Sequence, residues 1–245
     1  MNKIVLITGS SRGIGKETVI AFAKEGYDVI ITYLKEEEKA KELKTFIEDT
    51  YKVNADIEKL DLSSEESIKS LYEYINDKYG RLDVLVNNAA ISIDTLYEDK
   101  TKEDFMKILE VNLVGTFLIT KYLGKIMLNN KSGKIINVSS DAALGYGYSE
   151  SIDYDASKAG IISLTHDMAK YYAPYINVNA VAPGWVTTDM NKELDDNQIK
   201  NINKKNMLNR FATPEEIANV IVFLASDKAS YINDEIIKVN GGIYE

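Results

Sequence analysis

The sequence predicts a single α/β domain in which helices cover both faces of a parallel sheet. Short apolar stretches alternate with stretches at helical spacing along the whole chain, as in repeated strand–helix units. The apolar stretches lack polar–apolar alternation, which is typical of strands that are buried on both faces. A length of 245 residues suits one domain with a sizeable core, so we expect residues 1–245 to fold as one unit.

The expected elements follow one another in regular order. The expected strands span residues 3–7, 28–33, 54–60, 84–86, 134–138, 177–181 and 235–239. The expected helices span residues 14–25, 36–51, 65–79, 102–129, 154–173, 195–206 and 215–225. The charge-dense run 35–44 carries Glu/Lys pairs at helical spacing, which favours a solvated helix face.

The composition excludes several classes of protein. The chain contains no cysteine, which excludes disulfides, cysteine–zinc sites and thiol catalysis. His166 is the sole histidine, so a His-rich metal site is excluded and no metal is expected. A formal net charge of -9 disfavours binding to nucleic acid and to anionic membranes, because both require clustered cations.

The sequence favours a cytoplasmic location. The apolar run at residues 4–7 is too short for a signal peptide and meets glycines at once. No apolar run approaches the roughly 20 residues that cross a bilayer. We therefore expect a protein of a reducing compartment with no membrane span.

A glycine-rich turn follows the first expected strand. Gly9, Gly13 and Gly15 lead from this strand into a helix. In a doubly wound sheet, this turn places backbone N–H groups and the helix N-terminus against a pyrophosphate, and side chains would block the approach. A glycine pattern alone can be an ordinary turn, but its position in the first strand–helix connection favours a dinucleotide site.

Tyr154 and Lys158 lie one helical turn apart, so both project from the same helix face. A neighbouring ammonium lowers the pKa of a phenol from its usual value of about 10. Tyr154 would then serve as an acid in reduction and as a base in oxidation. The chain has 16 tyrosines, so the pattern also arises by chance, but its place shortly after a strand favours a catalytic pair.

Three separated motifs resemble the short-chain dehydrogenase/reductase family along essentially the whole chain. They are the Gly-x-x-x-Gly-x-Gly spacing at residues 9–15, Asn-Asn-Ala-Ala at residues 87–90, and Tyr-Asp-Ala-Ser-Lys at residues 154–158. The resemblance implies a Rossmann-type sheet of seven strands, a nicotinamide cofactor, no metal and usually a homotetramer. Ala90 stands where the family usually has glycine, and we expect this change to be tolerated.

The resemblance and the strand ends together imply a set of cofactor contacts. Asp61 would hold the adenine with Leu62 behind it, Asn87 and Ala89 would line the ribose wall, and Val186 and Thr188 would grip the carboxamide. The expected cofactor-binding residues are Gly9, Ser11, Arg12, Gly13, Ile14, Gly15, Tyr33, Lys35, Asp61, Leu62, Asn88, Ala89, Pro183, Gly184, Val186 and Thr188.

The end of the second expected strand favours NADPH over NADH. Thr32 and Tyr33 stand where NAD enzymes commonly place an acid that bonds the ribose 2′-hydroxyl. Arg12 and Lys35 could pair with a 2′-phosphate. The alternative is that both are surface cations whose field is diluted by the glutamates at residues 36–38.

The resemblance implies four catalytic residues, Asn112, Ser140, Tyr154 and Lys158. Ser140 would bond the substrate carbonyl and Tyr154 would donate the proton. Lys158 would tune Tyr154 and bond the nicotinamide ribose, and Asn112 would order a water for proton relay. Ser139 stays open as an alternative to Ser140, because the loop between this pair and Tyr154 is one residue longer than usual.

Residues 209–218 and 239–244 are most similar to the bacterial 3-oxoacyl-acyl carrier protein reductases of this family. This similarity implies reduction of a 3-oxoacyl thioester by NADPH in fatty-acid synthesis. Asp141, Glu150 and Asp153 near the expected pocket favour the alternative of a small polar ketone, sugar or alcohol as substrate. A non-catalytic dinucleotide sensor is the third possibility, although all four catalytic residues are present.

Two further expectations concern the outer parts of the molecule. The polar segment 189–208 is expected to be a substrate lid that orders on ligand binding, the alternative being a plain surface helix. The expected helices 102–129 and 154–173 carry apolar residues on more than one face, which suits burial between subunits of a homotetramer.

Overall fold

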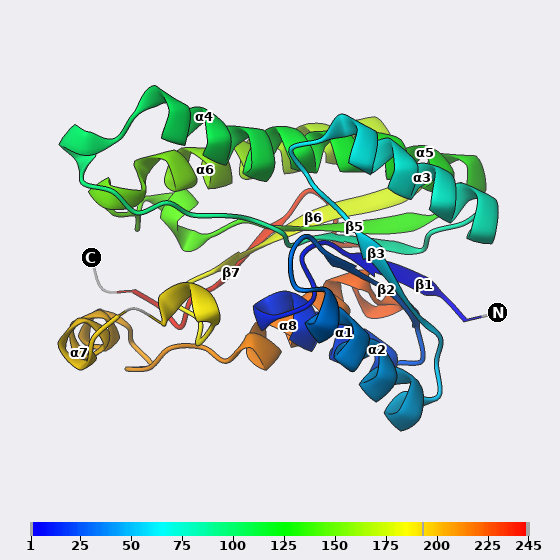
Figure 1. The fold of residues 1–245 in the computed structure, drawn as a ribbon, viewed down its shortest axis with the longest axis horizontal. Coiled ribbons are helices and arrows are strands. Elements are labelled where there is room, and N and C mark those ends of the chain that lie inside the picture. Colours follow the sequence, from blue (N-terminus) through cyan, green and yellow to red (C-terminus); the bar gives the residue numbers. More distant parts are fainter. Residues whose placement is uncertain (1, 193, 244–245) are drawn as a thin grey trace.

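The computed structural model describes residues 2–192 and 194–243 and confirms the doubly wound α/β fold (Figure 1). Within these residues, seven parallel strands form one sheet in the order β3-β2-β1-β4-β5-β6-β7. The strands are β1 Ile4–Ile7, β2 Asp28–Tyr33, β3 Ala55–Lys59, β4 Val84–Asn87, β5 Gly133–Val138, β6 Ile176–Pro183 and β7 Ile236–Val239. The strand order reverses between β1 and β4, which opens a crevice at their carboxyl ends.

Helices cover both faces of the sheet (Figure 1). One face is covered by α1 Gly13–Lys24, α2 Glu37–Tyr51 and α8 Pro214–Ala225. The other is covered by α3 Glu65–Tyr79, α4 Lys102–Leu109, α5 Thr116–Asn130 and α6 Ile152–Tyr172, while α7 Asp196–Lys205 lies to one side. Successive residues of β1 point to opposite faces, so Val5 and Ile7 join the first core and Ile4 and Leu6 the second.

The expected helix over residues 102–129 is interrupted, which corrects the prediction of one regular helix. A π-helical turn, Glu110–Gly115, separates α4 from α5. Two glycines allow the close packing around it. A Cβ atom on Gly115 would lie 2.6 Å from the carbonyl oxygen of Leu62, and one on Gly160 would lie 2.8 Å from Leu113. The widened turn carries Asn112, and such turns occur frequently at functional sites.

One helical stretch is long and apolar enough to cross a membrane by length and composition alone. It is the continuous stretch Lys102–Asn130, and half of its most apolar window is buried inside the fold. This stretch is apolar because it packs against the sheet. Its residues Ile119, Leu123 and Ile126 belong to the core between the sheet and this layer of helices. Helices that face a large core reach this hydropathy through their buried side chains.

Candidate active site

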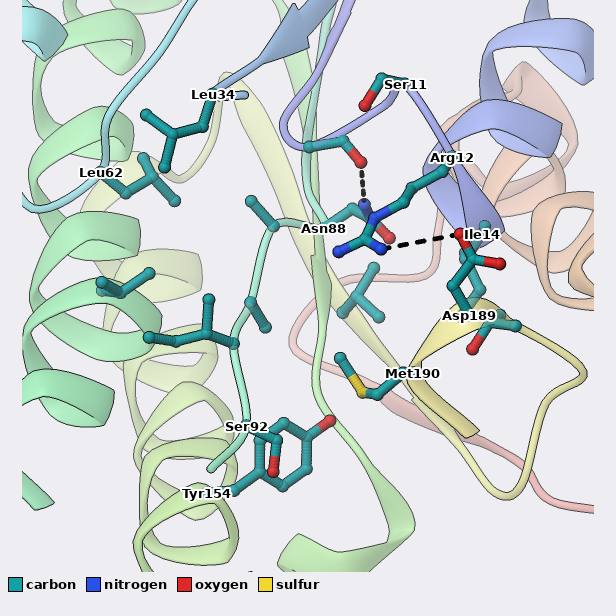
Figure 2. Close-up of a pocket in the computed structure, with 18 of the residues that line it drawn as sticks. Ser11, Arg12, Ile14, Leu34, Leu62, Asn88, Ser92, Tyr154, Asp189 and Met190 are labelled. Atoms are coloured by element: carbon teal, nitrogen blue, oxygen red, sulfur yellow. Dashed lines mark hydrogen bonds and ion pairs between the residues drawn. The ribbon is translucent and has the colours of Figure 1, made fainter. Parts of the chain in front are cut away.

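A cleft of about 650 Å³ opens at the carboxyl ends of β1, β2, β4 and β5. This volume is within the usual range of small-molecule sites. Figure 2 shows Leu34 and Leu62 at one end and Tyr154 with Ser92 at the other. The lining of the cleft includes most of the predicted catalytic and cofactor-binding residues. These are Gly9, Ser11, Arg12, Gly13, Ile14, Tyr33, Lys35, Asp61, Leu62, Asn88, Ala89, Ser140, Tyr154, Lys158, Pro183, Gly184, Val186 and Thr188.

The glycine loop fits the close approach of a dinucleotide. Gly9 and Gly13 have φ of +62° and +57°, in the left-handed region that favours glycine. A Cβ atom on Gly9 would lie 2.9 Å from the Cβ of Ala89. The predicted contact Gly15 is placed beneath the loop and outside the cleft lining, where a Cβ atom would lie 2.6 Å from the carbonyl oxygen of Gly9.

The segment after β4 supports the glycine loop from below. The Asn88 side-chain amide donates to the carbonyl oxygens of Thr8 at 2.9 Å and Gly9 at 3.2 Å. The expectation that Asn87 lines the ribose wall is not met. Its amide is buried and donates to Thr120 and to Asn137, both at 2.8 Å, because its side chain points into the core and away from the cleft.

The end of β2 combines cations with carboxylates. Lys35 and Glu36 both line the cleft, and Glu36 pairs with Lys39 at 3.0 Å. Arg12 faces Asp189 across the cleft, with 3.6 Å between the guanidinium and the carboxylate (Figure 2). Arg12 and Lys35 are therefore both available to an anionic ligand. Each also has a carboxylate nearby, Asp189 for Arg12 and Glu36 for Lys35.

The reaction end of the cleft holds Ser140, Tyr154 and Lys158. The ammonium of Lys158, whose residue is 3% exposed, donates to the carbonyl oxygen of Val138 at 2.7 Å. The same ammonium lies 5.4 Å from the centre of the Tyr154 ring. The Ser140 hydroxyl lies near Tyr154 in the cleft lining and accepts from the Ala142 amide at 3.2 Å. The Ser139 hydroxyl instead donates to the carbonyl oxygen of Lys158 at 2.8 Å, so the geometry favours Ser140 over Ser139.

Burial shifts the pKa values of both Tyr154 and Lys158. It raises the pKa of Tyr154 above its ordinary value, while the nearby Ser140 hydroxyl lowers this pKa and the carboxylates of Asp155 and Asp141 raise it further. The expectation that Lys158 leaves Tyr154 with a lowered pKa is therefore corrected, because desolvation by burial is the largest influence on the phenol. Burial also lowers the pKa of Lys158 to about 8.

Asn112 lies behind the cleft wall and is 1% exposed. Its side-chain oxygen accepts from the Ile91 amide at 2.9 Å, and its nitrogen donates to the Ile91 carbonyl oxygen at 2.9 Å and to Ser157 at 3.1 Å. The cleft lining does not include Asn112. The Asn112 side chain therefore links the cleft wall at Ile91 to α6 and does not itself line the reaction end of the cleft.

Several lining residues escaped sequence reasoning. They lie mainly in two segments, after β4 and at the start of the predicted lid: Ile91, Ser92, Ile93, Met190 and Asn191, together with Leu34, Lys107 and Val111. The signal that could have found them is position, because segments that follow parallel strands meet at one edge of the sheet.

The acidic residues expected near the pocket differ in exposure. Asp153 is fully buried and Asp141 is 7% exposed, whereas Glu150 is exposed. Asp141 accepts a hydrogen bond from Asn240 at 3.3 Å, and burial raises its pKa to about 6. Over residues 2–192 and 194–243, no group of three or more His, Asp or Glu side chains could hold a metal ion.

The chain resembles known proteins along its whole length. The profile of a family described as enoyl-(acyl carrier protein) reductase matches residues 9–244. The chain is 41% identical over 244 residues to the 3-oxoacyl-[acyl-carrier-protein] reductase FabG of Aquifex aeolicus, covering 99% of this chain and 97% of that protein. It is 38% identical over 244 residues to the protein of that name from Thermotoga maritima, covering 98% and 97%.

Solved structures agree with these matches. Levodione reductase superposes with a TM-score of 0.92 at 29% identity, covering 98% of this chain and 96% of that one. ElxO with NADP bound superposes with a TM-score of 0.90 at 35% identity, covering 99% and 98%.

The fold, the cleft and these matches define an NAD(P)-dependent oxidoreductase. More particularly, the chain belongs to the enoyl-(acyl carrier protein) reductase family of the short-chain dehydrogenases/reductases. The resemblance seen in the glycine loop and the Tyr154–Lys158 motif is thereby confirmed.

Proposed function

We propose that this protein is a cytoplasmic reductase that converts a 3-oxoacyl thioester to the 3-hydroxyacyl thioester with NADPH. The observation that carries the proposal is the meeting of Ser140, Tyr154 and Lys158 beside the glycine loop in one cleft. Relatives 41% and 38% identical over nearly their whole length, named 3-oxoacyl-[acyl-carrier-protein] reductases, support the substrate class.

The residues of the cleft fit a nicotinamide dinucleotide. Gly9 and Gly13 leave room for phosphates at the start of α1, Asp61 and Leu62 suit the adenine end, and Val186 and Thr188 suit the carboxamide. The bound cofactor supplies a hydride to the carbonyl carbon. The protein then has to bind the carbonyl oxygen, stabilise its growing negative charge and deliver one proton to it.

The side chains divide these tasks. The Ser140 hydroxyl donates to the substrate oxygen, as a fixed donor aimed at developing charge. Tyr154 stays protonated near neutral pH because its pKa is raised, and it gives its proton to that oxygen. The Lys158 ammonium, whose pKa is about 8, stabilises the tyrosinate that results. We assign Asn112 to holding the wall at Ile91, beside which a relay water would bind.

The choice of NADPH over NADH depends on Arg12 and Lys35. Both line the cleft where a 2′-phosphate would enter, and the structural relative ElxO carries NADP. A comparison of melting temperatures with NADPH and NADH tests this, because a ligand that binds the folded state raises the melting temperature by mass action. NADPH should give the larger rise, and an equal or larger rise with NADH would contradict the proposal.

A substrate panel separates the two candidate activities. The second candidate is reduction of a small ketone, favoured by the likeness to levodione reductase. We expect acetoacetyl-coenzyme A to give a higher kcat/KM than simple ketones, sugars or alcohols. Turnover of ketones without turnover of the thioester would overturn the carrier-protein assignment and retain the reductase.

Two features of assembly and motion complete the proposal. We propose that segment 189–208, of which residue 193 lies outside the described residues, closes over bound substrate. Its α7 buries no residue among those described, and Met190, Met207 and Leu208 are more than half exposed. We also propose a homotetramer that receives its thioester from an acyl carrier protein. Slower amide exchange of segment 189–208 with ligands would support the lid, and light scattering would test the tetramer.

A further inference from the structure

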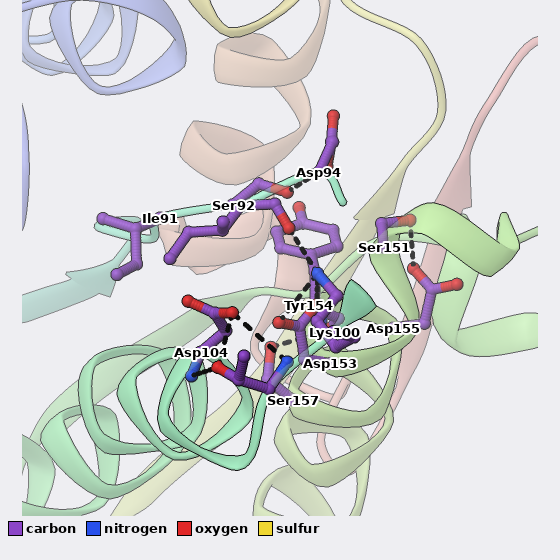
Figure 3. Close-up of polar contacts among 12 residues, drawn as sticks. Ile91, Ser92, Asp94, Lys100, Asp104, Ser151, Asp153, Tyr154, Asp155 and Ser157 are labelled. Carbon is purple, nitrogen blue, oxygen red and sulfur yellow. Dashed lines mark hydrogen bonds and ion pairs between the residues drawn. The ribbon is translucent and has the colours of Figure 1, made fainter. Parts of the chain in front are cut away.

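A buried ion pair, Lys100 with Asp153, lies directly beside Tyr154. The Lys100 ammonium is 3.2 Å from the Asp153 carboxylate, and the two side chains are 5% and 0% exposed. Figure 3 shows Lys100 between the segment that carries Ser92 and Asp94 and the first turn of α6. Neither residue belongs to the cleft lining, so the pair acts on the site only through its neighbours.

The pair joins the wall of the cleft to the catalytic helix. Lys100 donates to the carbonyl oxygen of Ile93 at 2.5 Å as well as to Asp153. Asp153 in turn accepts from the backbone amide of Tyr154 at 2.9 Å. One ammonium therefore holds a lining residue of the wall and, through a single carboxylate, the backbone from which the Tyr154 ring projects.

A second tie holds the same wall from the other side. Asn112 bonds both backbone groups of Ile91 and donates to Ser157 on α6. The Ser157 hydroxyl donates to the carbonyl oxygen of Tyr154 at 2.6 Å. The wall at residues 91–93 is thus fixed to α6 on both sides of Tyr154, through Asp153 before it and Ser157 after it.

Stability alone does not account for this arrangement. A buried ion pair loses hydration of both charges, and apolar residues of similar volume often serve stability equally well. Here, however, the ammonium makes a bond to the wall that an apolar side chain could not make. We propose that Lys100 is a positioning residue that, through Asp153 and Ile93, sets the distance between Tyr154 and the substrate held against the wall. The inference rests on the proposed reductase function.

The test compares three variants of the full chain. Lys100→Met leaves Asp153 buried without its partner and is expected to lose stability. The double variant Lys100→Met/Asp153→Asn removes both charges, keeps an acceptor for the Tyr154 amide and loses the tie to Ile93. Lys102→Met is the matched control, because Lys102 is exposed in the first turn of α4.

The double variant should keep the melting temperature of the wild type, and its affinity for NADPH should stay within about twofold. Its kcat should fall about 10- to 100-fold, because a small misplacement of the reacting groups slows the reaction steeply. Amide exchange of residues 91–95 should become faster than in the wild type. The control variant Lys102→Met should change neither kcat nor the amide exchange of residues 91–95. If Lys100→Met does not fold, the double variant carries the test alone.

Two results would overturn the inference. One is a double variant that folds and reduces substrate with kcat within twofold of the wild type. The other is unchanged exchange at residues 91–95. If the wild type itself reduces no carbonyl compound, the proposed function fails, and the exchange measurement then decides on the positioning role separately.

Discussion

The two ends of the cleft are built on different physical plans. The phosphate end consists of backbone and small side chains, with Gly9 and Gly13 in left-handed conformation and the Arg12 side chain 57% exposed. The reaction end has the buried Lys158 in its lining and further buried charged groups behind that lining. Lys158 and Asp141 are less than a tenth exposed, and so are the side chains of the Lys100–Asp153 pair.

The difference follows from what each end binds. A dinucleotide brings its own negative charges, so that end requires space, amide donors and cations that stay in water until the ligand arrives. A carbonyl substrate is neutral, and its charge develops only during the reaction. The protein must then supply fixed charges and donors in a dry site, where they act strongly. Changes of volume should therefore damage the first end, and changes of charge or hydrogen bonding should damage the second.

A large loss of cofactor affinity is expected from filling the phosphate end. Gly9→Ala places a Cβ atom 2.9 Å from that of Ala89, at a φ that alanine adopts with strain. We expect NADPH affinity to fall on the order of 100-fold, measured by titration of intrinsic fluorescence. Gly26→Ala is the matched control, because Gly26 shares a positive φ but would meet nothing within 4 Å. Equal losses in the two variants would mean that backbone strain alone, and not closeness to the ligand, causes the effect.

The adjacent serines at the reaction end should respond differently. Ser140→Ala removes the donor beside Tyr154, and we expect kcat to fall on the order of 100-fold with NADPH affinity unchanged. Ser139→Ala removes a buried bond to the Lys158 carbonyl, so it should cost about 1–2 kcal/mol of stability and less than tenfold in kcat. Steady-state kinetics and thermal unfolding measure both. A larger kcat loss in Ser139→Ala would restore the alternative assignment.

A further contrast concerns the dependence of stability on pH. Asp141 has a pKa raised from 3.8 to about 6 by burial, so the folded state binds more protons than the unfolded state between these values. Asp141 therefore lowers stability progressively as the pH rises from about 4 to about 6, by about 3 kcal/mol at most.

The variant Asp141→Asn should abolish this loss. Its melting temperature should exceed that of the wild type at pH 7, and the gain should shrink at pH 4, as differential scanning calorimetry would show. A gain of the same size at pH 4 and pH 7 would contradict this prediction, because it would mean that the pKa of Asp141 does not differ between the folded and unfolded states.

Local patterns predicted the fold and the cofactor end well. The strands lie near their expected positions because apolar runs between turn residues are local signals, and the glycine loop is one contiguous motif. To predict that Ala90 and the other residues line the cleft, one needs to know only which strand ends lie next to one another. The four-residue spacing placed Tyr154 and Lys158 on one helix face, and the family resemblance added their catalytic roles.

The reaction end depends on contacts that no local pattern contains. Lys100 and Asp153 are 53 positions apart, and only the packing of the segment after β4 against α6 brings them together. Asp141 and Asp153 were expected near the pocket, but their burial depends on tertiary packing and could not be predicted. The π turn at Asn112 is accompanied by the close approach of Gly115 to Leu62, which a helical periodicity does not reveal.

The most direct test of the central claim is the rate of Tyr154→Phe together with its cofactor affinity. This variant keeps the ring and its packing and removes the single proton that the mechanism transfers. We predict that kcat for acetoacetyl-coenzyme A falls about 10²- to 10⁴-fold while the Kd for NADPH changes less than twofold. Reduction at an undiminished rate by Tyr154→Phe would contradict the account.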